Sequence, residues 1–230
     1  MAQLTLHVLK PSVNNMAARV FLRAAKLDFV EDDAWGKTRS PEFLKKNPAH
    51  MTPMIEGKGL PKGTLWESCA IMQYLANKHE LSKFYPKNPA KRAMIDSAMF
   101  YLTGTLYPLV ARATYPALGF PAYPGEVAAT ALDAAHKKDA QDAAISAIAE
   151  PLDVFLKFYM DKGAFIGGAK PSIADIRLAA TLEFLAVIDY ALPAWAKTYM
   201  GAMEKSLGKA YAEPAADVRG YIAHVKSQRK

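Results

Sequence analysis

Apolar residues in the first third of this chain follow two different spacings, which predicts a mixture of strands and helices. Residues 4–8 place apolar side chains at alternate positions, as in a short strand, and Pro11 prevents its continuation as a central strand. Ser40 followed by Pro41 is typical of a helix start, because serine caps the first turn and proline fits its first position. The predicted elements, in order, are a strand at 4–8, a helix at 16–27, a strand at 29–32, a helix from 41, a two-strand ribbon at 54–55 and 64–66, and a helix that Glu67 opens. This βαβ-ββα order predicts an α/β domain with a mixed sheet covered by helices.

After residue 90 the spacing of apolar residues becomes helical and stays so to the end. This change predicts a second domain made only of helices. We therefore expect an α/β domain at 1–85, a linker at 86–91 and an all-α domain at 92–230.

Prolines suggest where the helices of the second part stop. Pro108, Pro116, Pro121 and Pro124 predict that the first helical stretch is interrupted and ends in a proline-rich elbow. Residues 126–162 are predicted to form one long helix that Pro151 kinks or divides.

A helix start of a different kind follows at Ser172. Asp175 stands three residues later, which is the spacing of a capping box, and the apolar run 176–188 comes next. A helix that is apolar on nearly every face belongs in the middle of a domain. We expect this motif to serve folding and not catalysis.

Composition and charge exclude several classes of protein. With 51% hydrophobic and 22% charged residues, and no apolar run long enough to span a bilayer, the chain is expected to be soluble, with no membrane partner. The net charge of +7 is scattered, so we expect no nucleic-acid partner, although a positive N-terminal half could steer a small anion. Cys69 is the one cysteine, which excludes an internal disulfide and fits the cytoplasm. The five histidines show no metal-ligand spacing, so no metal is expected.

Four segments in order resemble the cytosolic glutathione transferase family, and the resemblance spans nearly the whole chain. They are Asn-Pro-Ala-His-Met-Thr-Pro-Met at 47–54, Glu-Ser-Cys-Ala-Ile at 67–71, Tyr85-Pro86, and the capping box after Gly167-Gly168. The serine-type theta-like and phi-like classes are the most similar. The resemblance implies a thioredoxin-like N-terminal domain that binds glutathione.

The resemblance also implies how the tripeptide is held. Pro53 would be cis, so that the backbone of Thr52 pairs with the cysteinyl unit as an added strand. Ser68, at a helix N-terminus, would donate to the γ-glutamyl carboxylate, and Glu67 would lie beside the same unit. The remaining candidates are basic residues: Lys37 and Arg39 near the glycine carboxylate, and His50 in place of the lysine or glutamine that the family often has before the cis-proline.

The residue that meets the sulfur has more than one candidate. Counting along the first strand without a gap places the family's serine at Ser12. Counting back from Arg19, which resembles the family's first-helix arginine, gives Asn14 or Asn15, and some relatives use an asparagine amide. A hydroxyl here would donate a hydrogen bond to the thiolate, which is the nucleophilic form. We favour Ser12 and keep Asn14 as the main alternative.

These residues predict an enzyme that conjugates glutathione to electrophiles or reduces organic peroxides. The family's fourth helix faces the cleft, so the candidates for a hydrophobic electrophile site are Tyr101, Leu102, Tyr107 and Tyr115. The resemblance also implies a homodimer. The alternative is a non-enzymatic interaction module such as the transferase-like domain of translation elongation factor 1B gamma.

Overall fold

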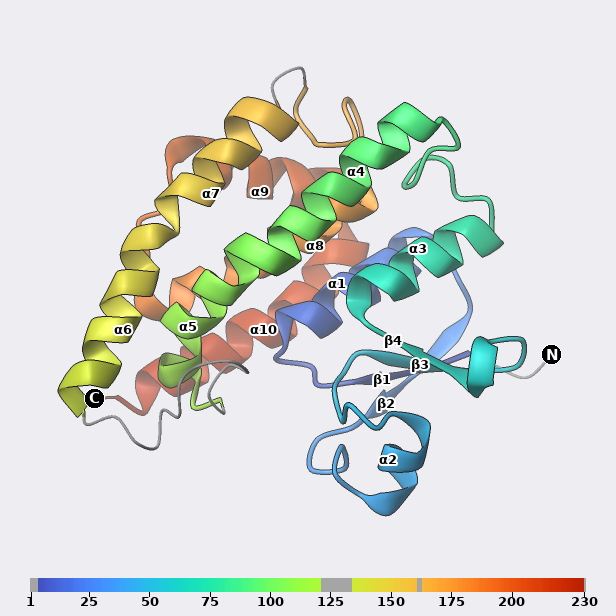
Figure 1. Cartoon of the computed structure of the whole chain (residues 1–230), viewed down its shortest axis with the longest axis horizontal. Helices are drawn as coiled ribbons and strands as arrows, with labels where there is room; N and C mark the ends of the chain where they lie inside the picture. The colour runs from blue at the N-terminus through green and yellow to red at the C-terminus, as the bar shows by residue number, and fades with distance from the viewer. Residues whose placement is uncertain (1–3, 121–133, 161–162, 230) are drawn as a thin grey trace.

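A four-stranded sheet lies at one end of the molecule, and helices make up the remainder (Figure 1). The computed structural model describes residues 4–120, 134–160 and 163–229. The strands are β1 Leu4–Val8, β2 Phe29–Asp33, β3 Met54–Glu56 and β4 Thr64–Trp66. Their spatial order is β2-β1-β3-β4, with β1 parallel to β2 and the other two pairs antiparallel. The mixed sheet predicted from the sequence is confirmed.

Helices cover both faces of this sheet. They are α1 Val13–Ala24, α2 Pro41–Lys46 and α3 Ser68–Lys78. Helices α1 and α3 lie on the side that faces the helical part, and α2 lies on the opposite side (Figure 1). Successive side chains of β3 point to opposite faces of the sheet, and each face is covered by helices. Ile55 joins the main core on one face, whereas Met54 packs with Phe43 of α2 on the other. Ser40 caps α2 as predicted, accepting a hydrogen bond from the Phe43 amide at 3.2 Å.

The second part of the chain is helical as predicted. Its longer helices are α4 Pro89–Tyr101, α5 Tyr107–Leu118, α6 Ala134–Ala147, α7 Ala149–Val154, α8 Ile173–Glu183, α9 Ala194–Leu207 and α10 Lys209–Ser227. Its shorter segments are η2 Leu102–Leu106, η3 Phe155–Tyr159 and η4 Phe184–Ile188, whereas η1 Pro61–Gly63 lies between β3 and β4 in the first part. None of the helices in the described ranges is long and apolar enough to cross a membrane. The domain boundary at 86–91 stays a prediction; Asn88 caps α4 there, accepting from the Lys91 amide at 3.0 Å.

The prediction that Pro108 and Pro116 break the first helical stretch is wrong. The chain stays helical from α4 through the π-helical segment η2 to the end of α5. Pro108 lies in the first turn of α5, directly after the wider π turn, where a missing amide hydrogen and a bulky ring are accommodated. The helix ends at Leu118, and Gly119 follows in the left-handed region. Pro121 and Pro124 lie outside the described residues.

The long helix predicted at 126–162 is divided near Pro151, as expected. Helix α6 ends at Ala147, and α7 begins two residues later with Pro151 in its first turn. Residues 126–133 and 161–162 of the predicted helix are outside the described part of the chain.

Helix α8 is the buried centre of the helical part. Every residue from Ile173 to Glu183 is buried, and the helix packs against both α1 and α4. The capping box is confirmed: Ser172 accepts from the Asp175 amide, and Asp175 accepts from the Ser172 amide at 2.7 Å. Because α8 also contacts α1 and α3, it forms the wall between the sheet and the remaining helices.

Candidate active site

The start of α1 carries the two candidates for the sulfur contact. Ser12 is the N-cap of α1, with an extended backbone and a half-buried side chain. Its hydroxyl makes no hydrogen bond within the described ranges, whereas its carbonyl oxygen accepts from the Met16 amide at 2.8 Å. A free hydroxyl at a helix N-terminus is a donor available to an anion.

Asn15 connects this start to the proline loop. Its side chain is fully buried, accepts from the Leu9 amide at 3.2 Å and donates to the Thr52 hydroxyl at 3.1 Å. The Thr52–Pro53 peptide bond is cis, as predicted. Both ends of the Asn15 amide are therefore engaged in holding two loops together, which gives this side chain a structural role and brings Thr52 close to the first turn of α1.

The start of α3 has an unusual backbone. Glu67, the N-cap, has φ 72° and ψ 115°, a region that non-glycine residues rarely adopt. Its side chain is exposed, and Ser68 behind it is only 5% exposed. Burial raises the pKa of the neighbouring Cys69 thiol, while Arg177 and Ser68 act in the opposite direction. Cys69 is therefore a protonated packing residue at neutral pH.

The basic candidates lie on loops around the sheet. Lys37 is exposed on the loop after β2, and its ammonium nitrogen lies 3.5 Å from an Asp32 carboxylate oxygen. Arg39 is exposed on the same loop, and His50 is half-buried with φ 48° before the cis-proline. Among the residues that the structure describes, none of these three side chains is hydrogen-bonded to Ser12, Thr52 or Ser68. Their assignment to the site therefore stays a prediction.

Two of the four electrophile candidates, Tyr107 and Tyr115, connect to the first turn of α1. The Asn14 amide nitrogen donates to the Tyr107 hydroxyl at 2.7 Å, and the Tyr107 and Tyr115 hydroxyl oxygens are 2.7 Å apart. Desolvation raises the pKa of Tyr107, so its phenol stays protonated. The chain of contacts links α1 to α5 across the boundary between sheet and helices.

Aromatic rings extend from Tyr115 along the helical part. Its ring centroid lies 5.4 Å from that of Phe120, which lies 5.8 Å from Tyr221 of α10. Trp35, 56% exposed on the loop after β2, follows at 6.4 Å from Tyr221. The result is an aromatic surface that begins beside Asn14 and ends at an exposed indole.

The other two candidates point elsewhere. Tyr101 packs against Phe155 and Tyr159, with ring centroids 5.7 Å and 6.1 Å away. Leu102 is 1% exposed in the main core. The contacts of these two residues thus run toward α7 and η3 or into the core, and not toward Asn14.

The sequence interpretation missed Arg177 of α8. The guanidinium donates to the Asn14 side-chain oxygen and lies over the Tyr107 ring, with its central carbon 4.7 Å from the ring centroid. The run 176–188 is mostly apolar but holds two charged residues, Arg177 and Glu183, and that was the signal available in the sequence. Its partner Asn14, 163 positions away in the chain, could not be inferred from that signal.

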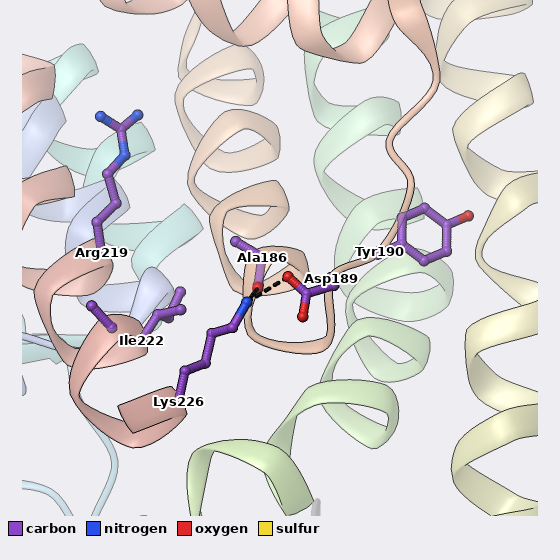
Figure 2. Close-up of a pocket in the computed structure, with 7 residues that line it drawn as sticks. Ala186, Asp189, Tyr190, Arg219, Ile222 and Lys226 are labelled. Carbon is purple, nitrogen blue, oxygen red and sulfur yellow. Dashed lines mark hydrogen bonds and ion pairs between the residues drawn. The ribbon is translucent and has the colours of Figure 1, made fainter. Parts of the chain in front are cut away.

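A separate hollow lies at the far end of α8, between η4 and α10. Figure 2 shows Lys226 reaching the Ala186 carbonyl oxygen and the Asp189 carboxylate, with Arg219 and Tyr190 at its margin. The Lys226 and Asp189 charges pair at 2.5 Å, and Arg219 pairs with Glu183 at 2.7 Å. No residue predicted for the site lines this hollow, and its cations Lys226 and Arg219 are each already paired with a carboxylate.

Comparison with known proteins gives one consistent result. Residues 2–77 match the glutathione S-transferase N-terminal domain, and residues 138–208 match the glutathione S-transferase C-terminal domain. A glutathione transferase of Bombyx mori is 28% identical, with TM-score 0.74 and coverage of 98% of this chain and 97% of that one. Glutathione transferase E6 from Drosophila melanogaster is 27% identical, with TM-score 0.76 and coverage of 98% and 97%. A homologue from Drosophila mojavensis, solved with bound glutathione, is 23% identical, with TM-score 0.74 and coverage of 99% and 98%, and shows the shared fold.

Proposed function

The chain belongs to the cytosolic glutathione transferase family, and we propose that it activates glutathione with the Ser12 hydroxyl at the start of α1. It is an enzyme with glutathione as its co-substrate. The single observation that carries the proposal is the Ser12 hydroxyl, which has no hydrogen-bond partner among the described residues. The Asn15 amide is engaged at both ends, and Asn14 keeps one amide hydrogen after its bond to Tyr107, so Ser12 is the primary donor. No comparison reported above favours the interaction module.

The energetic requirement for thiol activation matches this arrangement. Lowering a thiol pKa by about two units from its reference value of about 8.5 requires roughly 2.7 kcal/mol of free energy that stabilises the thiolate. One charge-assisted hydrogen bond contributes about 1.5–3 kcal/mol, and a helix N-terminus adds to it. Ser12 caps α1 and offers both.

The rest of the tripeptide is proposed to lie along the cis-proline edge and the start of α3. The Thr52 backbone pairs with the cysteinyl unit beside Pro53 as an added strand. Ser68 donates to the γ-glutamyl carboxylate at the N-terminus of α3, with Glu67 next to it. Lys37, Arg39 and His50 are proposed to face the glycine end, where a positive charge favours a carboxylate.

The electrophile is proposed to be a small hydrophobic molecule bound against Tyr107 and Tyr115. The aromatic surface that continues through Phe120 and Tyr221 favours a flat or aromatic substrate, because offset and edge contacts suit such rings. The contacts of Tyr101 and Leu102 favour a packing role for both. Conjugation and peroxide reduction both begin from the same thiolate.

The test compares Ser12→Ala and Asn14→Ala with wild type for retention on immobilised glutathione and for conjugation of a chlorinated aromatic. If Ser12 holds the thiolate, Ser12→Ala keeps binding but loses about 10- to 100-fold in turnover at neutral pH, the equivalent of one charged hydrogen bond. The matched control is Ser146→Ala on the exposed face of α6, which changes a serine far from the site. Retained turnover in Ser12→Ala with loss in Asn14→Ala would transfer the role to Asn14. Glutathione binding without any turnover in wild type would favour the interaction module.

We also propose that the protein forms a homodimer in the cytoplasm. Helix α4 exposes two large apolar side chains, Met94 at 39% and Phe100 at 73%, which a second copy could cover. The free Cys69 fits a reducing compartment. Sedimentation at micromolar concentration tests the dimer, and a monomer there contradicts it.

A further inference from the structure

Arg177 is a buried cation without a carboxylate partner. It is 2% exposed, and it makes no ion pair with any residue in 4–120, 134–160 or 163–229. The guanidinium donates to the Asn14 side-chain oxygen and the Thr181 hydroxyl, and it lies over the Tyr107 ring. Its Nε is buried without a hydrogen-bond partner. Arginine stays protonated in proteins, so a full positive charge is held here by neutral groups.

The other buried arginine of the core is treated differently. Arg19, 3% exposed, pairs with Glu31 at 2.9 Å and with Asp217 at 2.7 Å. Burying a charge without its counter-ion is unfavourable, and a cation–π contact offsets only part of that. An unpaired buried cation therefore stabilises a negative charge that binds close to it. Such a cation is typical of a site that binds an anion.

The surroundings of Arg177 are the proposed glutathione site. Helix α8 packs against α1 and α3, and the guanidinium acts on groups of both: Asn14 of α1, and Cys69 of α3. The titratable groups that face it are Cys69 and Tyr107, both protonated, and the charge of the exposed Glu67 acts on those same two groups. Asp175, on its own helix, is occupied by backbone amides and by Tyr199.

We propose that Arg177 is a positioning residue that holds the Asn14 amide toward the sulfur site, where Asn14 acts as a second donor beside Ser12 and adds to the stabilisation of the glutathione thiolate. This inference rests on the proposed function. The Asn14 oxygen accepts from the cation, and one amide hydrogen goes to Tyr107, which leaves the second amide hydrogen for the sulfur. Hydrogen bonds in a chain polarise each other, so the cation makes the amide a stronger donor. The thiol proton leaves to solvent, and Arg177 takes no part in its transfer.

The first experiment measures the pKa of bound glutathione. The thiolate absorbs in the ultraviolet, so a pH titration of the binary complex gives the pKa directly, separately from turnover. Arg177→Met is expected to raise this pKa by about 1 unit, and Arg177→Lys, which keeps the charge, is expected to restore at least half of the shift. The matched control is Arg219→Met, which removes an arginine paired with Glu183 and should reduce stability while leaving the thiol pKa unchanged. An unchanged pKa in folded Arg177→Met, or equal shifts in the Met and Lys variants, overturns the proposal.

A second measurement needs no loss of the side chain. In wild-type protein labelled with ¹⁵N-arginine, the Arg177 Nε resonance, assigned with Arg177→Lys, is expected to follow the ionisation of the bound thiol. A resonance that stays constant across that pH range overturns the proposal even if Arg177→Met fails to fold. Calorimetry with wild type distinguishes failure of the proposed function from failure of this inference. If millimolar glutathione gives no heat of binding, the proposed function is wrong. If glutathione binds normally but the Arg177 Nε resonance does not change with pH, only the inference about Arg177 is wrong.

Discussion

Replacement of Asp175 by alanine is expected to cost more stability than almost any other single polar change in this chain. The carboxylate is fully buried at the start of α8 and accepts five hydrogen bonds from four residues. The donors are the amides of Ile166 at 2.8 Å, Gly167 at 3.0 Å and Ser172 at 2.7 Å, together with the hydroxyls of Ser172 at 2.7 Å and Tyr199 at 3.0 Å. Burial raises the pKa of this carboxyl group, and the hydrogen bonds from Ser172, Ile166 and Gly167 oppose the rise.

The magnitude follows from the donors left behind. Alanine cannot accept a hydrogen bond, and the two hydroxyls can rotate to other acceptors, but the three backbone amides cannot. A buried donor without a partner costs about 1–3 kcal/mol, so three of them predict a loss of about 4–6 kcal/mol. Asp175→Asn keeps one acceptor oxygen but turns an amide group toward the donors, and we expect an intermediate loss of about 2–4 kcal/mol.

Urea denaturation followed by circular dichroism checks this prediction, with the slope of the free energy against urea compared between variants. The matched control is Asp153→Ala on α7, whose pair with Lys157 is exposed and should change stability by less than about 0.5 kcal/mol. A loss below about 1 kcal/mol for Asp175→Ala, with an unchanged slope, would show that water or a shifted loop satisfies the amides, and the reasoning would fail.

Two further predictions concern the N-terminal part. Burial works to raise the pKa of Glu31, but hydrogen bonds from Arg19 and Arg23 outweigh it, so the folded pKa lies below the ordinary value of 4.5. The stabilisation is therefore complete above that pH and declines as the pH falls through the lowered pKa. Glu31→Gln should cost about 2–3 kcal/mol at neutral pH, less than a fully broken buried pair because Arg19 keeps Asp217, and the difference from wild type in urea titrations should shrink as the pH falls below 4.5. Glu67→Gly should relieve the positive φ and stabilise the free protein by about 1 kcal/mol while weakening glutathione binding in calorimetry; a variant that is both less stable and equally good at binding contradicts the role proposed for Glu67.

The sequence determined the local elements of this protein. The strand alternation at 4–8, the Ser40-Pro41 start and the Ser172–Asp175 box depend on residues within a few positions of each other, and each is present as expected. The cis bond at Pro53, expected from the family resemblance, is also present. The proline rule failed at Pro108, because whether a helix tolerates proline depends on the hydrogen-bond register of the turn before it.

Tertiary structure alone decided how the candidate site is assembled. Counting could not separate Ser12 from Asn14 and Asn15. The fold engages both ends of the Asn15 amide, ties Asn14 to a tyrosine 93 positions away with one amide hydrogen left over, and leaves the serine hydroxyl free. It also brought the Tyr115 hydroxyl to that of Tyr107 and packed Tyr101 against Phe155, although the sequence alone places both tyrosines equally well at either site. Local spacing sets which backbone forms a helix. Which side chains meet, and which charge such as Arg177 is left without a counter-ion, is set only when α8 packs against α1 and α3.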